Sequence, residues 1–445
     1  MSETYAVKKI NTAVDWNVTV PGSKSMTNRA LLIAALAECE VELEGVLFSD
    51  DSRYFLSSLQ SLGFSLAIDE KEKRVALTGC GGRIPKKEAE IYVGSAGTAA
   101  RFLTAMLGCS DGCYTINASE QMKKRPMKPL FDLLIGMGAK ITYLEQEGFL
   151  PVQIEGINYT KSGCETTDTK EEKPVLLELD ISKSTQFLSA MLLVSPMLKQ
   201  GMRIHITSEK ADGSYIRITR KMMETFGVTT AFDGRDYEIP AGAVYRLFDA
   251  HYVVEPDMSA ACYFYAAAAM TGGKALVRNV HMDNTQGDLK FLDVLEEMGC
   301  MVLDTPEGIR VSGPAVGELR GIDINMNDFS DQTMTLAVIA PFAKERVHIY
   351  GIGHIRGQES DRIHGITTEL TRLGIRCEEE EAAITIYPGE PKPGLVQTYE
   401  DHRMAMAFSL IGLRAEGIVI NDPFCCKKTF ENYFEVLSDL TRDMM

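Results

Sequence analysis

The chain repeats one pattern of apolar and polar positions. Five amphipathic segments each end in an apolar residue followed by glycine, and a short apolar run follows. These glycines recur at intervals of roughly 75 residues: Gly63, Gly138, Gly227, Gly299 and Gly374. Because a glycine after the last helical turn can adopt the left-handed conformation, it lets the chain leave a helix. The pattern therefore predicts five helices that each lead through a glycine into a strand.

A second kind of helix, apolar on almost every face, accompanies each of these segments. Six such stretches occur: 23–36, 97–107, 184–197, 257–270, 331–343 and 401–413. A helix that is apolar all round should be buried inside its domain. Short β-branched runs predict strands at 114–118, 202–208, 275–280, 346–352 and 417–422. A sixth unit closes with an amphipathic stretch at 432–440.

Six units of two helices and several strands favour an α/β fold with two domains of three units each. The buried helices begin with Ser, Thr, Asp or Gly, so we expect their free backbone N–H groups and positive dipole ends to gather at one end of each domain. If the two domains face one another, these helix starts line a cleft that binds anions.

Composition narrows the class of protein. A length of 445 residues exceeds one domain, and the 45% hydrophobic and 24% charged shares are those of a globular enzyme. Acidic residues (62) outnumber Lys and Arg (46), and the net charge of −16 disfavours nucleic-acid or acidic-membrane partners. No apolar run approaches the ~18 residues of a membrane span, and no signal peptide is evident. We therefore expect a cytoplasmic protein.

Cysteine and glycine motifs give little sign of a metal or cofactor. Ten cysteines are scattered along the chain, some within apolar segments, as Cys262 is, which favours buried free thiols over disulfides. The seven histidines offer no HExxH motif, and paired CxxC motifs are absent from the sequence, which disfavours zinc. The GSAGT segment at 94–98 fits neither the Walker nor the dinucleotide pattern.

Basic residues recur at the starts of the apolar helices and in the loops beside them. They are Lys24, Arg29, Arg101, Arg125 and Arg403, together with the pairs Arg356 and Arg362, and Lys427 and Lys428. Because arginine clamps carboxylates and phosphates and lysine adds a point charge, this recurrence predicts a substrate set with several negative charges. Acid–base candidates lie in the same segments: Asp331, Glu359 and His402. Glu359 could instead be an ion-pair partner that orients an arginine.

Nine motifs carry a family resemblance. They are PGSKSMTNRALL, GSAGTAARFL, KRPMKPL, STQFLSAMLL, VEPDMSAACYF, SDQTMTLAV, ESDRI, YEDHRMAMAF and KKTFENYF. In this order, from residue 21 to 434, they resemble the 5-enolpyruvylshikimate-3-phosphate synthase family. The RPM and KTFxxYF segments separate that family from UDP-N-acetylglucosamine enolpyruvyl transferase. This transferase remains the second hypothesis, and a non-catalytic anion-binding homologue is the third.

The resemblance implies a two-domain inside-out α/β barrel of six βαβαββ-type repeats, with buried parallel helices whose N-termini face the interdomain cleft. Residues 22–254 would form the shikimate-3-phosphate domain. Residues 1–21 with 255–445 would form the phosphoenolpyruvate domain, which also holds the acid–base residues. The implied reaction transfers the carboxyvinyl group of phosphoenolpyruvate to the 5-hydroxyl of shikimate 3-phosphate and releases phosphate, by addition and elimination, in aromatic amino acid biosynthesis. The resemblance implies no metal or cofactor, no partners besides these two small molecules, and a monomer.

The resemblance also assigns roles to individual residues. Lys24, Asp331 and Glu359 would be catalytic. Shikimate 3-phosphate would be bound by Lys24, Ser25, Arg29, Ser184, Thr185, Gln186, Tyr215, Asp331 and Gln358. Phosphoenolpyruvate would be bound by Lys24, Gly97, Arg125, Gln186, Arg362, Arg403 and Lys428.

Five positions depart from the family pattern: Ser95 and His354 replace a frequent asparagine, Lys124 replaces a frequent glutamate, and Asp212 and Gln358 bear directly on the candidate site. Asp212 falls near the position where members of the family have a serine that contacts the 3-phosphate. Ser208 or Ser214 would have to take the place of that serine in this chain. Gln358 stands where the commoner pattern has lysine, and glutamine carries no charge and relays no proton. Three neighbours could supply the missing cation: His354, Arg356 and Lys427.

Overall fold

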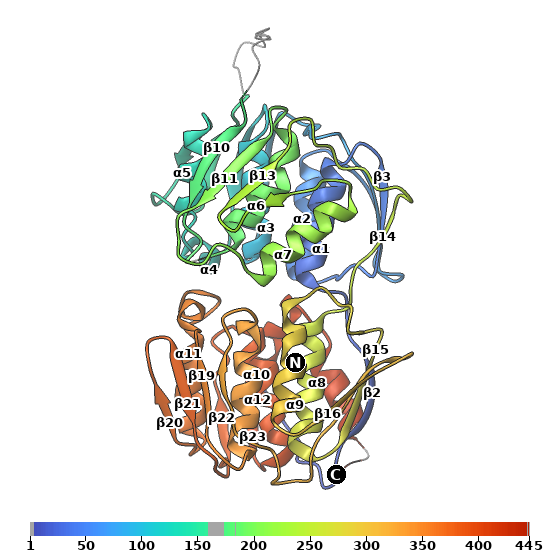
Figure 1. Cartoon of the computed structure of the whole chain (residues 1–445), viewed down its shortest axis with the longest axis vertical. Coiled ribbons are helices and arrows are strands. Elements are labelled where there is room, and N and C mark those ends of the chain that lie inside the picture. The colour runs from blue at the N-terminus through green and yellow to red at the C-terminus, as the bar shows by residue number, and fades with distance from the viewer. Residues whose placement is uncertain (1–3, 159–172, 183, 443, 445) are drawn as a thin grey trace. The chain divides into compact units, whose positions relative to one another are not determined.

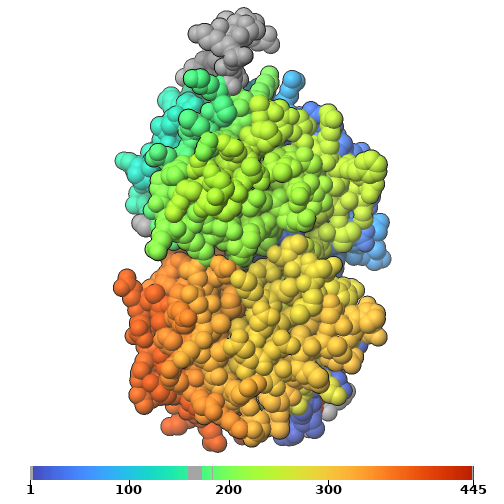
Figure 2. All heavy atoms as spheres, in the orientation of Figure 1, coloured from blue at the N-terminus to red at the C-terminus, as the bar shows by residue number. Residues whose placement is uncertain are grey.

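The computed structural model describes residues 4–158, 173–182, 184–442 and 444. The chain divides into two compact units, which we call unit 1 (residues 1–21 and 255–445) and unit 2 (residues 22–254). In the space-filling view, blue atoms from the start of the chain lie among the yellow and orange atoms of residues 255–445 (Figure 2).

Unit 2 contains three four-stranded sheets with one strand order. The first is β14-β3-β5-β4 (His251–Val253, Glu40–Glu44, Arg74–Thr78, Ser65–Asp69). The second is β6-β7-β9-β8 (Glu88–Tyr92, Cys113–Asn117, Val152–Glu155, Lys140–Tyr143). The third is β10-β11-β13-β12 (Val175–Leu179, Met202–Ile206, Asp236–Ile239, Ala231–Phe232). In each sheet the first pair is parallel and the other two are antiparallel, so the sequence repeat is also a repeat of topology.

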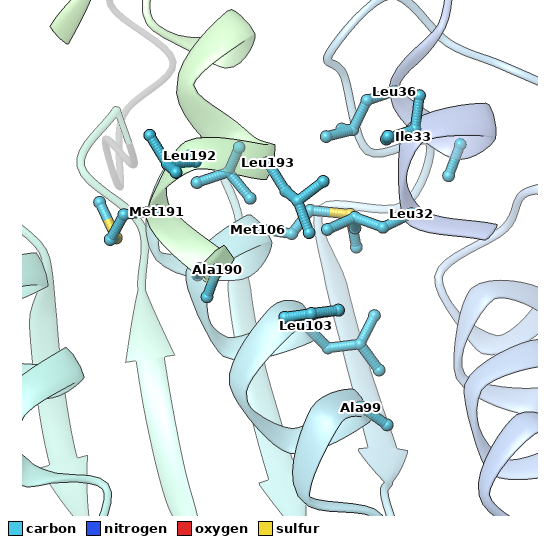
Figure 3. Packing of buried hydrophobic residues seen from close by; sticks show 14 of the residues in the cluster. Leu32, Ile33, Leu36, Ala99, Leu103, Met106, Ala190, Met191, Leu192 and Leu193 are labelled. Carbon is cyan, nitrogen blue, oxygen red and sulfur yellow. The ribbon is translucent and has the colours of Figure 1, made fainter. Parts of the chain in front are cut away.

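Three buried helices form the centre of unit 2. They are α1 (Lys24–Leu36), α3 (Gly97–Gly108) and α6 (Gln186–Val194), and they contact one another. Figure 3 shows side chains of all three meeting, including Leu32, Leu103 and Leu193. The amphipathic helices are α2 (Asp50–Ser61), α5 (Lys128–Gly136) and α7 (Ser214–Thr225), and α4 (Glu120–Lys123) is short.

Unit 1 repeats this plan in two four-stranded sheets, and its third sheet has three strands (Figure 1). Its sheets are β16-β17-β15-β2 (Met301–Thr305, Gly308–Ser312, Lys274–Arg278, Asp15–Thr19), β18-β19-β21-β20 (Asp323–Asn325, Val347–Tyr350, Ala383–Ile386, Cys377–Glu379) and β1-β23-β22 (Thr4–Ala6, Ile418–Asn421, Gly394–Val396). The N-terminal strands β1 and β2 pair with β23 and β15, so the start of the chain completes two of its sheets.

The helices of unit 1 are also of two kinds. Buried α8 (Met258–Thr271), α10 (Thr333–Ile339) and α12 (His402–Arg414) contact one another. The amphipathic helices are α9 (Phe291–Glu297), α11 (Arg362–Arg372) and α13 (Tyr433–Thr441). Short 3-10 turns η2 (Gly287–Lys290), η3 (Ser330–Gln332), η5 (Gly353–Gly357) and η6 (Pro423–Lys428) carry several of the candidate site residues.

The predicted glycine exits and buried helices are confirmed. The five repeat glycines all have positive φ: 91° at Gly63, 107° at Gly138, 82° at Gly227, 105° at Gly299 and 82° at Gly374. Two buried helices are shorter than predicted, because α6 ends before Pro196 and α10 ends before Pro341. A proline has no N–H to continue a helix. The Ser195 hydroxyl instead donates to the Leu192 carbonyl, at 2.6 Å.

The described cysteines are all free: Cys39, Cys80, Cys109, Cys113, Cys262, Cys300, Cys377, Cys425 and Cys426. Cys164 lies outside the described residues. The described part of the chain contains no His, Cys, Asp and Glu group arranged to hold a metal ion. None of its helices is both long enough and apolar enough to span a membrane.

Candidate functional site

In unit 2, hydrogen bonds join the starts of the buried helices. The Asn28 amide of α1 donates to the Thr98 hydroxyl of α3, at 2.9 Å. The Arg101 guanidinium of α3 donates to Oε1 of Gln186, the first residue of α6, at 2.7 Å. Residues that lie far apart in the sequence are therefore held together at one end of the helices.

Arg29 is a buried cation surrounded by neutral acceptors. Its side chain is 1% exposed and donates to the Thr219 hydroxyl at 2.8 Å and to the carbonyls of Ser25 (2.9 Å) and Tyr215 (3.3 Å). Its guanidinium also lies over the ring of Phe102, at 5.3 Å. Burial lowers the pKa of Arg29 to about 10, and Tyr215 partly opposes that shift. An anionic ligand would supply the charge that these neutral partners do not.

Arg101 and Arg125 converge on Gly97, at the first turn of α3. A Cβ on Gly97 would lie 2.7 Å from Nη1 of each arginine, so any larger residue would require both guanidinium groups to shift. Arg101 is fixed by the Gln186 amide and by the Gly97 carbonyl, at 3.2 Å. The predicted residues Gly97, Arg125 and Gln186 therefore lie close together. Two cations beside a helix N-terminus form a site suited to an anion.

The remaining predicted residues of unit 2 lie at the same helix starts. Lys24 is the first residue of α1, and its Nζ lies 3.5 Å from Oδ2 of the buried Asp51 in α2. The Ser184 hydroxyl accepts from the Gln186 N–H at 3.3 Å, just before α6. Thr185 lies 3.6 Å from the Cβ position of Gly213, which immediately precedes α7.

In unit 1, Asp331 joins two arginines from different helices. Oδ1 of Asp331 accepts from Nη1 of Arg362 at 2.9 Å, and Oδ2 accepts from Nη2 of Arg403 at 2.9 Å. Arg362 is the first residue of α11, and Arg403 lies in the first turn of α12. The structure thus brings these three predicted residues together, although they are 31, 41 and 72 positions apart (362 − 331, 403 − 362, 403 − 331).

Asp401 is a second buried anion of this cluster. It caps α12 by accepting from the Arg403 N–H at 3.0 Å, and it accepts from Nε of Arg362 at 2.8 Å. Burial alone would lower the pKa of Arg362, but the charges of Asp401 and Asp331 outweigh burial and raise it. Arg362 therefore stays charged although it is buried.

Gln358 and Glu359 turn toward different partners. The Gln358 amide oxygen accepts from Nη1 of Arg362. Glu359 forms an ion pair with Lys428 of η6, and both side chains are largely buried. Gln358 therefore contacts the Asp331 cluster through Arg362, whereas Glu359 and Lys428 pair with each other.

The three neighbours that could replace a cation at position 358 differ in their contacts. Arg356 is held by Asp361 at 3.0 Å and by Glu379 at 2.9 Å. Nε2 of His354 lies 2.8 Å from the Ser330 hydroxyl, one residue before Asp331. Nζ of Lys427 lies 5.4 Å from the ring centre of Phe424.

Comparisons with known proteins show which family the chain resembles. A family model described as EPSP synthase (3-phosphoshikimate 1-carboxyvinyltransferase) matches residues 8–437. The chain is 41% identical to the 3-phosphoshikimate 1-carboxyvinyltransferase of Trichormus variabilis over 433 residues, which cover 97% of this chain and 98% of that protein. It belongs to the EPSP synthase family.

Other EPSP synthases agree with this membership. The 3-phosphoshikimate 1-carboxyvinyltransferase of Serratia proteamaculans is 40% identical over 432 residues, which cover 96% of this chain and 97% of that protein. A solved EPSP synthase from Acinetobacter baumannii superposes with a TM-score of 0.78 at 24% identity and covers 99% of this chain and 98% of its own. This likeness shows that the chain has the two-domain α/β fold of EPSP synthase structures.

The sequence does not point to three carboxylates that lie beside the candidate site residues. Asp51 beside Lys24, Asp401 beside Arg362 and the buried Asp288 near Asp331 were not among the candidates. A signal existed only for Asp401, because an aspartate directly before an apolar helix is a typical N-cap. Lys24, which pairs with Asp51, lies 27 positions away in the chain (51 − 24), and Arg362, which pairs with Asp401, lies 39 positions away (401 − 362).

Proposed function

We propose that this chain catalyses transfer of the carboxyvinyl group of phosphoenolpyruvate to the 5-hydroxyl of shikimate 3-phosphate, with release of phosphate. The observation that carries the proposal is the convergence of the SDQTM, ESDRI and YEDHRM motifs on Asp331 in unit 1. Membership of the EPSP synthase family supports the same reaction. A monomer in the cytoplasm remains a prediction from the sequence.

Charge supports the choice of substrates. Both are phosphorylated carboxylates, so together they carry about six negative charges, whose mutual repulsion must be offset. In this proposal, Arg29 with Ser25 and Tyr215 binds shikimate 3-phosphate. Phosphoenolpyruvate is bound by Arg125 beside Gly97, by Arg362 and Arg403, and by Lys428. Lys24 and Gln186 contact both substrates.

Ser214 is our choice for the serine that contacts the 3-phosphate. The Ser208 hydroxyl is already engaged, because it donates to the Lys210 carbonyl at 3.0 Å and accepts from the Ile181 N–H at 3.2 Å. Asp212, which by itself would repel phosphate, is paired with Arg217 at 2.9 Å. Ser214 begins α7, where the backbone N–H groups and the dipole also favour an anion.

The chemistry requires a proton at C3 of phosphoenolpyruvate and removal of the proton of the attacking hydroxyl. The oxygen then bonds to C2, and the tetrahedral adduct loses phosphate and a C3 proton to form the product. We assign the C3 proton transfer to Glu359, because its partner Lys428 can give up a proton whereas the arginines on Asp331 cannot. Asp331 and Lys24 are assigned to the hydroxyl.

One assay separates this function from its alternatives. The protein is incubated with phosphoenolpyruvate and either shikimate 3-phosphate or UDP-N-acetylglucosamine, and inorganic phosphate is measured. We expect release only with shikimate 3-phosphate. Release with the UDP-sugar would favour the second hypothesis, and no release with either would favour a non-catalytic homologue.

Gln358 provides a further test of this assignment. Its amide already bonds Arg362, and His354 lies near Asp331 through Ser330. We therefore expect Gln358→Lys to keep turnover within about tenfold of the parent, a span of ~1.4 kcal/mol. A larger change in either direction would mean that the charge at this position is not compensated.

A further inference from the structure

Asp288 is a buried carboxylate that none of the motifs above includes. It lies in η2, just before α9, and is 6% exposed. Its Oδ2 accepts from the Ser259 hydroxyl and from Nε2 of Gln332, the latter at 2.8 Å. The pKa of Asp288 is raised to about 6, mainly by burial and then by the charge of Asp331, while Arg403 and the hydrogen bonds from Ser259 and Gln332 oppose the shift. Asp288 is therefore within electrostatic reach of two residues of the candidate site.

The bond to Asp288 determines which way the Ser259 hydroxyl points. A hydroxyl has one proton, and Ser259 donates that proton to Asp288. Its oxygen can then act only as an acceptor toward Arg403, whose Nη2 lies 3.3 Å away. The same Nη2 also donates to Asp331. Ser259, in the first turn of α8, therefore helps to hold the Arg403 guanidinium in place.

The bond to Gln332 anchors the turn that carries Asp331. Oε1 of Gln332 accepts from the Thr335 hydroxyl at 2.9 Å, so its amide N–H group is left to face Asp288. Gln332 is fully buried and directly follows Asp331 in η3. One carboxylate thus holds both the turn bearing Asp331 and the hydroxyl that contacts Arg403.

We propose that Asp288 is a positioning residue for enolpyruvyl transfer, which orients Arg403 through Ser259 and Asp331 through Gln332. The proposal rests on the proposed function, because it assigns Arg403 to phosphoenolpyruvate. A carboxylate suits this position because one oxygen accepts from two donors that come from different helices and turns. Asp288 itself touches no substrate in this arrangement.

The test compares Michaelis constants of four variants. Ser259→Ala should raise KM for phosphoenolpyruvate about tenfold or more and leave KM for shikimate 3-phosphate within about twofold. Asp288→Ala should raise KM for phosphoenolpyruvate at least as much and also lower kcat, because it releases the turn that carries Asp331. The KM of the double variant for phosphoenolpyruvate should exceed that of Asp288→Ala by no more than about twofold, because both changes remove the same Asp288–Ser259–Arg403 contact. Asp293→Ala, on the exposed face of α9, is the matched control and should leave both constants unchanged.

Rescue separates positioning from a merely structural role. Asp288→Asn keeps an oxygen that can accept both hydrogen bonds, so it should recover most of the KM for phosphoenolpyruvate. If Asp288→Ala does not fold, KM for phosphoenolpyruvate is compared between Asp288→Asn and Ser259→Ala instead. Additive effects of the two alanine changes on KM for phosphoenolpyruvate, or equal rises in both KM values for Ser259→Ala, would overturn the proposal.

A crystal structure of Asp288→Ala, or of Ser259→Ala if the former does not fold, gives a readout independent of turnover. Arg403 should move away from its position between residue 259 and Asp331. An unmoved Arg403 would overturn the proposal whatever the activity. Absence of phosphate release by the parent would instead refute the proposed function, and the Arg403 position would still decide the role of Asp288.

Discussion

Replacing Gly97 with alanine should weaken phosphoenolpyruvate binding while leaving the fold intact. The added Cβ would lie 2.7 Å from Nη1 of both Arg101 and Arg125, whereas ordinary contacts begin at 3.4 Å. Each guanidinium must therefore withdraw by about 0.7 Å (3.4 − 2.7). Because Arg125 also has its Cζ 3.0 Å from the added Cβ, we expect the larger displacement at Arg125, with a smaller shift of Arg101 against the Gln186 amide that it contacts at 2.7 Å.

The magnitude follows from the bonds that Arg125 would lose. A hydrogen bond to a charged group contributes about 1.5–3 kcal/mol, and a 0.7 Å displacement of the guanidinium breaks its alignment with a bound carboxylate or phosphate. At about 1.4 kcal/mol per factor of ten, KM for phosphoenolpyruvate should rise about 10- to 100-fold. Stability should change little, because alanine favours a helix more than glycine does.

Steady-state phosphate release, with each substrate varied in turn, measures this effect. Gly136→Ala is the matched control, because Gly136 also lies in a helix and nothing lies within 4 Å of its Cβ position. A KM for phosphoenolpyruvate within about twofold of the parent would refute the reasoning. An equal rise in KM for shikimate 3-phosphate would show that the shift of Arg101 and Gln186 outweighs that of Arg125.

Three further outcomes are expected. Arg362→Met should lower the free energy of unfolding by about 3–5 kcal/mol, measured by denaturant unfolding, because the buried Asp401 carboxylate loses its arginine partner. Adding Asp401→Asn should restore part of the loss. The folded-state pKa of Asp288 is raised to about 6 from 3.8, so the free energy of unfolding should fall by up to about 3 kcal/mol as pH rises from about 4 to 6. Asp288→Asn should remove most of this pH dependence. A variant with the same pH dependence as the parent would contradict the prediction. Glu359→Gln should lower kcat by ~10²-fold or more with KM nearly unchanged, because the amide beside Lys428 cannot accept a proton. If the variant keeps the parental kcat across pH 5 to 9, another residue must transfer the proton.

Local signals in the sequence were enough to predict the repeats. Helix periodicity, strand runs and glycines such as Gly63 and Gly374 act over a few residues, and each of these glycines has the left-handed φ that the pattern required. The ends of α6 and α10 were misjudged because an apolar pattern continues through Pro196 and Pro341, although the α-helix does not. Apolar spacing alone does not register that Pro196 and Pro341 lack a backbone N–H donor.

The family motifs determined most candidate site residues but not their partners. The sequence placed Glu359 between two arginines, whereas the structure pairs it with Lys428, 69 positions away. It likewise gave no sign that Arg29 would be surrounded by neutral oxygens, or that one aspartate would hold Arg362 and Arg403. These contacts join helix starts from different repeats. Their geometry depends on how the buried helices pack, and only the tertiary structure decides that packing.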